Sequence, residues 1–209
     1  MLRASGFRFH EKGTTLVEII VVVFIIVIFS SILVSNFPKI LRQFALSRSV
    51  HKLSQDIRRV QDTGLSGVLI TEQEAGGQKW QIKAKGYGIY FSLNQNTRYI
   101  IYVDRGDSPD SRYDGNPQLC SENIFPESDC IFEIIYITDE DPDLYIKEIL
   151  NLSSGSANTS INFAPPNPDI SIDGLSSGDK EIGVVLGLQS DTSASRTVWV
   201  NISGLIKVE

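Results

Sequence analysis

Glu18 is the one charged side chain inside an otherwise apolar run, residues 16–34. A carboxylate placed inside a membrane costs on the order of 2–3 kcal/mol, and such residues are usually functional. The chemistry open to it is pairing with a cation, which offsets the cost of burying either charge alone. Because Glu18 lies near the start of the run, a second interpretation stays open, in which its carboxylate reaches the aqueous interface.

Cys120 and Cys130 are the two cysteines of the chain, and they enclose a short polar loop. Their spacing is not that of a C-x-x-C redox motif, so redox catalysis is not indicated. In an exported segment the surroundings are oxidising. A Cys120–Cys130 disulfide is therefore expected if this part of the chain leaves the cytoplasm.

Two acidic turns carry the remaining groups that could bind a ligand. Asp104, Asp107, Asp110 and Asp114 crowd the first turn, and the sequence DEDPD at 139–143 forms the second. Carboxylates on such turns supply the hard oxygen ligands that calcium prefers, although neither turn has EF-hand spacing. Calcium binding and ordinary solvated acidic turns both remain open, and solvated turns are the commoner case.

No set of residues suited to catalysis is present in the sequence. The chain has two histidines and lacks G-x-S-x-G, Walker and H-E-x-x-H motifs. Without a nucleophile and a base at a recognisable spacing, the sequence predicts a protein that is not an enzyme and has no resident cofactor.

The apolar run is long enough to cross a bilayer as one helix. Its 19 residues give a helix of roughly 29 Å, close to the hydrocarbon thickness of a membrane. It is apolar on every face, which suits lipid better than one side of a soluble core. Arg3, Arg8 and Lys12 precede it, against one acid, Glu11. This excess of positive charge places the N-terminus in the cytoplasm and the following chain outside. No A-x-A-like site follows the run, which disfavours a cleaved signal peptide.

The stretch Lys12-Gly13-Thr14-Thr15-Leu16-Val17-Glu18 resembles the prepilin processing site of type IV pilins and type II secretion pseudopilins. In that family a membrane peptidase cuts after the glycine and methylates the new amine. The resemblance therefore implies cleavage between Gly13 and Thr14 and N-methylation of Thr14, which stands where the family usually has Phe or Met. It also implies that Glu18 pairs with the amino terminus of a neighbouring subunit and sets the axial register. The implied partners are prepilin peptidase, other pilin or pseudopilin subunits and inner-membrane lipid.

Residues 36–62 are basic and amphipathic, and we expect them to continue the helix. They contain six bases and two acids. Apolar residues recur at three- and four-residue spacing, as in a helix with one buried face; they are Ile40, Phe44, Leu46, Val50, Leu53, Ile57 and Val60. Pro38 is expected to kink or locally melt this helix, and Gly64 and Gly67 are expected to end it.

Residues 63–209 form a predicted β-rich head. Ten bases and 21 acids give it a net charge of −11, which argues against nucleic acid as a partner. Short runs rich in β-branched and aromatic residues alternate with turns. The expected strands are 80–84, 87–91, 99–103, 131–138, 145–150, 160–164, 182–188, 196–202 and 205–208, with Ser203-Gly204 as a hairpin turn between the last two.

The order of four segments in the head resembles the GspH/FimT-like branch of minor pilins and pseudopilins. These segments are GYGIYFS (86–92), YIIYVD (99–104), INFAPPNP (161–168) and RTVWVNISGLIKVE (196–209). The resemblance implies a pilin-like α+β fold, in which a long N-terminal helix packs its second half on an antiparallel sheet. Some members bind DNA through arginines after the last glycine, whereas Gly204-Leu205-Ile206-Lys207 contains none.

Together these features predict a leader at 1–13, a transmembrane and filament-core helix at 14–35, an amphipathic helix at 36–62 and an extracytoplasmic head at 63–209. The predicted protein is a minor pilin or pseudopilin of the inner (cytoplasmic) membrane, a structural subunit of a type IV pilus or type II secretion pseudopilus. The alternative is a single-span, membrane-anchored extracytoplasmic binding module that does not polymerise.

Overall fold

The computed structural model of the chain describes residues 15–67, 69–73, 79–105, 112–115, 117–120, 128–165 and 169–209. The chain divides into two compact units, Met1–Leu41 and Arg42–Glu209. Gly13 and Thr14 at the predicted cleavage site, and Asp107 and Asp110 of the first acidic turn, lie outside the described residues.

One helix, α1 (Leu16–Ser66), begins in the first unit and ends in the second. The large apolar side chains of residues 16–34 keep between 43% and 74% of their surface exposed. This part of α1 is long and apolar enough to be a candidate membrane span. The helix continues through Pro38, so of the two predicted effects local melting is wrong, and the kink stays a prediction. Proline removes one backbone donor, and the hydrogen bonds before and after it suffice to keep the chain helical.

Within the second unit, α1 buries one face against the sheets. Its buried apolar residues are Ala45, Leu46, Val50, Leu53, Ile57 and Val60, each at most 4% exposed. Ile40 and Phe44 were also expected on this face, but both are exposed, so the buried face begins one turn later than predicted. The helix ends at Ser66, and the next residue, Gly67, has a positive φ of 63°, the left-handed conformation with which helices often terminate at glycine. The predicted stop at Gly67 is confirmed, whereas Gly64 lies inside the last turn.

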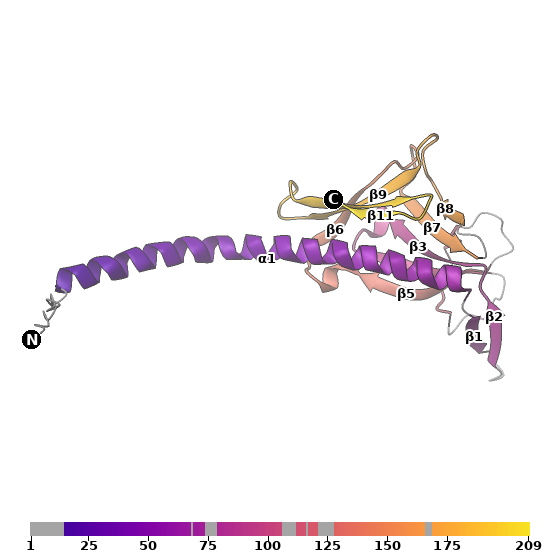
Figure 1. The fold of residues 1–209 in the computed structure, drawn as a ribbon, viewed down its shortest axis with the longest axis horizontal. Coiled ribbons are helices and arrows are strands. Elements are labelled where there is room, and N and C mark those ends of the chain that lie inside the picture. Colours follow the sequence, from indigo (N-terminus) through magenta and orange to yellow (C-terminus); the bar gives the residue numbers. More distant parts are fainter. Residues whose placement is uncertain are drawn as a thin grey trace, which may run out of the picture. The chain divides into compact units, whose positions relative to one another are not determined.

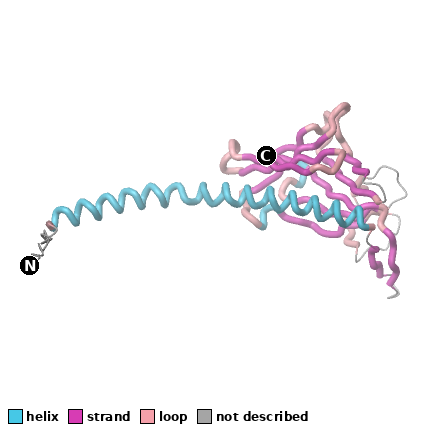
Figure 2. The backbone as a smooth tube through the Cα atoms, viewed as in Figure 1, coloured by secondary structure: helices cyan, strands magenta, loops and turns pink. Residues whose placement is uncertain are grey.

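The head has an antiparallel five-stranded sheet in the order β5-β4-β3-β7-β8. Figure 1 labels four of these strands, β3, β5, β7 and β8, and Figure 2 draws the strands in magenta. Its strands are β3 (Gly86–Ser92), β4 (Arg98–Asp104), β5 (Cys130–Tyr136), β7 (Asn158–Ala164) and β8 (Asp169–Ile172). Residues of β3 and β4 alternate between the two faces of the sheet, as strand geometry requires. Ile89, Phe91 and Ile101 join the core that contains α1, and Ile100 and Tyr102 form a smaller cluster that includes Tyr113.

A second antiparallel sheet has the order β11-β10-β9-β6. Its strands are β6 (Leu144–Leu150), β9 (Glu181–Leu188), β10 (Ser195–Asn201) and β11 (Ile206–Val208). Val184, Leu186, Val198 and Val200 belong to the same buried cluster as α1 and the five-stranded sheet. The helix and the two larger sheets therefore share one hydrophobic core.

Two further strands, β1 (Leu69–Gln73) and β2 (Lys79–Lys83), form a separate antiparallel pair, and two short 3₁₀ helices, η1 (Leu93–Gln95) and η2 (Ile137–Asp139), connect strands of the sheets. All nine predicted strands overlap observed ones, and β1 and β8 were not predicted. The turn between β10 and β11 is the expected hairpin, with Gly204 at a φ of 85°. The chain is thus an α+β protein with one long N-terminal helix and antiparallel sheets.

Candidate functional site

The start of α1 holds Glu18 in the first turn of the helix. Thr15 caps this end, because its Oγ1 accepts a hydrogen bond from the backbone N–H of Glu18 at 3.3 Å. Thr15 and Glu18 have the spacing of a capping box, and a carboxylate in the first turn interacts favourably with the helix dipole. Glu18 therefore has a local role at the helix start in addition to its predicted role in subunit register.

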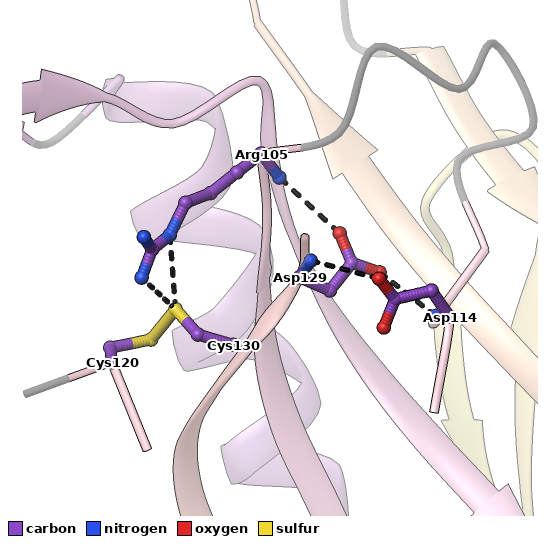
Figure 3. Close-up of a disulfide and its surroundings, with 5 residues drawn as sticks. All are labelled: Arg105, Asp114, Cys120, Asp129 and Cys130. Carbon is purple, nitrogen blue, oxygen red and sulfur yellow. Dashed lines mark hydrogen bonds between the residues drawn. A yellow bond between two sulfur atoms is a disulfide. The ribbon is translucent and has the colours of Figure 1, made fainter. Parts of the chain in front are cut away.

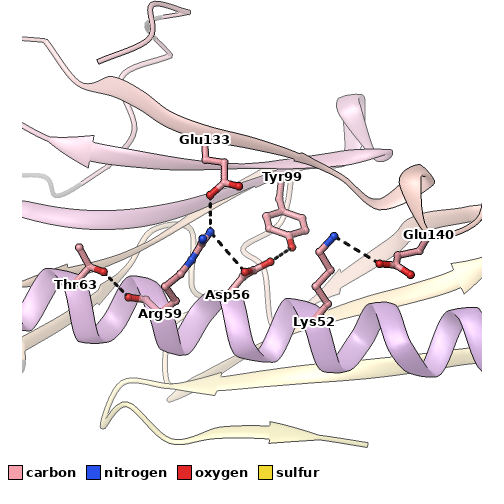
Figure 4. A network of polar contacts seen from close by, with 7 residues as sticks. All are labelled: Lys52, Asp56, Arg59, Thr63, Tyr99, Glu133 and Glu140. Carbon is pink, nitrogen blue, oxygen red and sulfur yellow. Dashed lines mark hydrogen bonds and ion pairs between the residues drawn. The ribbon is translucent and has the colours of Figure 1, made fainter. Parts of the chain in front are cut away.

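The second half of α1 is joined to the five-stranded sheet by a polar network centred on Asp56 (Figure 4). The Tyr99 hydroxyl, almost fully buried, donates to Asp56 Oδ2 at 2.6 Å. Arg59 Nη2 lies 3.6 Å from Asp56 Oδ1 and 2.6 Å from Glu133 Oε2. Burial, followed by the hydrogen bond to Asp56, raises the pKa of Tyr99, so the phenol remains a donor over the physiological range. Asp56 thus joins α1 to β4 through Tyr99, and Arg59 joins it to β5 through Glu133.

The second acidic turn contributes to the same contact between helix and sheets. Glu140 lies 3.6 Å from Arg48 and 3.7 Å from Lys52, and Asp143 lies 4.0 Å from Arg42. Arg42 also donates to Ser190 Oγ at 2.9 Å. These ion pairs are largely exposed and individually weak. Their arrangement shows that acids of the turn face bases of α1.

The predicted disulfide is present, with the Cα atoms of Cys120 and Cys130 4.9 Å apart (Figure 3). Arg105 lies against it at the end of β4 and is only 6% exposed. Its Nε and Nη2 donate to Cys130 Sγ at 3.1 and 2.6 Å. A buried guanidinium is therefore in direct contact with one of the two sulfur atoms.

Asp129 and Asp114 lie beside the disulfide and bind each other's backbone. The N–H of Asp114 donates to Asp129 Oδ2 at 3.0 Å, and the N–H of Asp129 donates to Asp114 Oδ2 at 3.1 Å. The N–H of Arg105 donates to Asp129 Oδ1 at 3.3 Å. Burial raises the pKa of the Asp129 carboxyl to about 7, with these backbone donors acting in the opposite direction.

The calcium hypothesis receives no geometric support from the part of the first acidic turn that the structure describes. Asp104 accepts a hydrogen bond from Asn162 Nδ2 at 2.7 Å, and Asp114 is engaged with Asp129. Among the described residues, no three Asp, Glu, His or Cys side chains are grouped so that they could hold a metal ion. Asp107 and Asp110 lie outside the described residues, so their predicted role is untested.

A polar hollow of about 450 Å³ lies beside the first acidic turn. Tyr90, Tyr113, Asp114 and Asp173 contribute to its lining, and Arg112 at its edge lies 3.7 Å from Asp173. The residues that line it include neither a histidine nor a cysteine. The hollow therefore brings together tyrosine, carboxylate and arginine side chains.

Sequence reasoning missed Asp56, Tyr99, Arg105 and Asp129 as interacting residues. Asp56 and Tyr99 are 43 positions apart, and Arg105 and Asp129 are 24 positions apart. Only the packing of α1 on β4, and the pairing of β4 with β5, bring these groups together.

Comparisons with protein-family models, with curated proteins and with solved structures find no match to this chain.

Proposed function

We propose that the chain is a minor pilin or pseudopilin, a structural subunit that assembles through its N-terminal helix after cleavage at Gly13. One observation carries the proposal. The same helix has a first half whose apolar side chains are exposed and a second half whose apolar face is buried in the head core. Large exposed apolar surface in water is unfavourable. The first half therefore needs lipid or similar helices around it.

The difference between the exposed first half of α1 and its second half, which packs in the head, supports a subunit that moves from the membrane to a filament. In the membrane, lipid would cover residues 16–34, with the N-terminus cytoplasmic and the head outside. In a filament, the equivalent helices of other subunits would replace the lipid. Glu18 would then pair with a neighbouring amino terminus, which offsets the cost of placing both charges in an apolar bundle. The disulfide is in keeping with an extracytoplasmic head.

The first test is the intact mass and N-terminal sequence of the chain isolated from its native membrane. The proposal expects a chain that begins at Thr14, keeps the apolar helix and carries an added methyl group on its amine. A chain that still begins at Met1 would indicate a membrane-anchored binding module that is not processed. A chain that begins beyond residue 34 would indicate an ordinary secreted protein, and either result would overturn the proposal.

The second test separates the two roles of Glu18. Glu18→Gln keeps the side-chain length and the capping-box pattern but removes the charge, whereas Thr15→Ala removes the cap and keeps the charge. If pairing with an amino terminus drives assembly, incorporation of Glu18→Gln into filaments falls by about tenfold or more, because an unpaired buried ammonium remains. Thr15→Ala is expected to assemble nearly normally. If wild type and Glu18→Gln assemble equally well, the charge of Glu18 is not required for assembly.

A further inference from the structure

The Cys120–Cys130 disulfide has chemically different surroundings at its two sulfur atoms (Figure 3). Two nitrogens of the Arg105 guanidinium donate to Cys130 Sγ. Cys130 is fully buried, while Cys120 keeps 7% of its surface exposed. The positive group therefore lies at the sulfur of the fully buried cysteine, whereas the other cysteine keeps a small exposed surface.

This asymmetry has a direct consequence for thiol–disulfide exchange. An attacking thiolate bonds to one sulfur and expels the other as a thiolate, and the reaction is faster when the expelled thiolate is more stable. A neighbouring guanidinium stabilises a thiolate by charge and by hydrogen bonds. Expulsion of Cys130, with attack on Cys120, is therefore favoured over the reverse.

We propose that Cys120–Cys130 is a directional thiol–disulfide exchange site, in which the thiolate of a dithiol reagent or dithiol oxidoreductase attacks Cys120 and Arg105 stabilises the departing Cys130 thiolate. The attack breaks the Cys120–Cys130 bond and forms a mixed disulfide on Cys120. The second thiol of the reagent then attacks the reagent's own sulfur and releases Cys120 as a thiolate. Two electrons pass from the dithiol, which becomes a disulfide, to the two protein sulfurs, which take up protons from water. The reverse sequence forms the bond, with Cys130 as the attacking thiolate.

Three acids surround the site, and Asp129 interacts electrostatically with the Arg105 guanidinium. Asp104, Asp114 and Asp129 are the carboxyl groups that interact around this site. Two of them accept hydrogen bonds from other groups, Asp104 from Asn162 and Asp114 from the Asp129 backbone. Burial raises the pKa of Asp129 to about 7, so a large part of this group is neutral near neutral pH. Of these charged groups, the guanidinium is the one that the structure shows hydrogen-bonded to Cys130 Sγ.

Backbone hydrogen bonds hold the segment around Cys120 in addition to the disulfide. The N–H of Cys120 donates to the Ile131 carbonyl at 2.9 Å, and the N–H of Ile131 donates to the Gln118 carbonyl at 2.8 Å. We expect these hydrogen bonds to keep the two cysteines adjacent when the disulfide is reduced. The exchange can therefore be followed in the folded chain.

The test identifies which cysteine receives the incoming thiol. The wild-type full-length chain in detergent is exposed briefly to reduced glutathione, and the reaction is quenched with acid and N-ethylmaleimide. The chain is then cleaved after glutamate, because Glu122 and Glu127 separate the two cysteines. Mass spectrometry then measures glutathione and maleimide on each cysteine at early times. We expect glutathione on Cys120 and maleimide on Cys130, with a preference of about threefold or more. Equal labelling, or glutathione mainly on Cys130, would overturn the proposal.

Variants assign the preference to the guanidinium. Arg105→Met is expected to bring the ratio of the two adducts close to one and to slow exchange by a similar factor. Arg112→Met is the matched control, because Arg112 is an exposed arginine near the same turn, and it should keep the wild-type ratio. A ratio that is unchanged in Arg105→Met would exclude Arg105 as the cause. If Arg105→Met does not fold, the wild-type ratio still decides the direction of attack. The test is independent of filament assembly.

Discussion

At the scale of single residues, Asp129 is a side chain whose protonation near neutral pH is coupled to the fold. Its carboxyl is 4% exposed and accepts backbone N–H groups from Arg105 and Asp114. Asp104 and Asp114 interact unfavourably with its ionised form, and burial is the largest cause of its raised pKa, about 7 against an ordinary 3.8. The folded chain therefore binds a proton here that the unfolded chain releases at a lower pH.

This coupling predicts a loss of stability as the pH rises. A raised folded-state pKa gives a contribution that is complete below about pH 4 and is lost progressively up to about pH 7. Its upper limit is about 4 kcal/mol for a shift of this size. Asparagine at position 129 cannot ionise, so the variant Asp129→Asn lacks this loss of stability. Between pH 5 and pH 8 the free energy of unfolding of wild type should therefore fall by about 1–3 kcal/mol relative to that of the variant. Urea unfolding without reductant at several pH values measures it. A constant difference would show that Asp129 does not titrate in this range.

At the scale of elements, the contact of α1 with β7 depends on the absence of a side chain at Gly64. A Cβ atom built on Gly64 would lie 2.5 Å from the carbonyl oxygen of Phe163 and 2.9 Å from its Cβ. Contacts this short with backbone cannot be relieved by rotating a side chain. The sequence predicts that the helix ends at Gly64. In the structure the helix continues to Ser66, and Gly64 instead allows the helix to approach the backbone of Phe163 closely.

Gly64→Ala is therefore expected to destabilise the head by about 1–2 kcal/mol, although alanine is the better helix former by about 1 kcal/mol. Gly187→Ala in β9 is a suitable control, since a Cβ there meets the side chains of Lys147 and Tyr145 at 3.3–3.5 Å. The control should change stability by less than about 0.5 kcal/mol. Chemical denaturation of both variants checks the prediction, and a stabilised Gly64→Ala would show that the sheet yields to the new methyl group.

The elements also show where sequence patterns stop being informative. Val50, Leu53 and Ile57 recur at helical spacing, and the nine predicted strands alternate apolar and polar residues or are rich in β-branched residues. Both patterns can be recognised within a few neighbouring residues, which is why these elements could be predicted. The strand β8 has only four residues and is defined by its pairing with β7. Arg105 and Asp129 meet where the paired strands β4 and β5 end. The pairing of these strands is a long-range contact that joins segments 24 positions apart, which is why the cluster around the disulfide could not be predicted.

At the scale of the whole molecule, the two halves of α1 face different surroundings. The apolar residues of the head core begin at Ala45, and the large apolar side chains of residues 16–34 are all exposed. The boundary between the compact units falls between Leu41 and Arg42. Arg42 already contacts Asp143 and Ser190 of the head. Among the described residues, all buried apolar residues of the head core therefore belong to the second unit.

A chain reduced to Arg42–Glu209 is accordingly expected to fold in water without detergent. It keeps the helix face that fills the core and loses only apolar surface that the head does not bury, so its free energy of unfolding should lie within about 1 kcal/mol of that of the full chain in detergent. A chain that begins at Thr63 is the matched control. It lacks Leu53 and Ile57, each of which contributes about 2–5 kcal/mol as a buried aliphatic side chain, and it should not fold. Circular dichroism and urea unfolding distinguish these outcomes, and membrane flotation should retain the full chain but not the Arg42–Glu209 fragment. Aggregation or unfolding of that fragment would show that the first half of α1 stabilises the head as well as covering it with lipid or neighbouring helices.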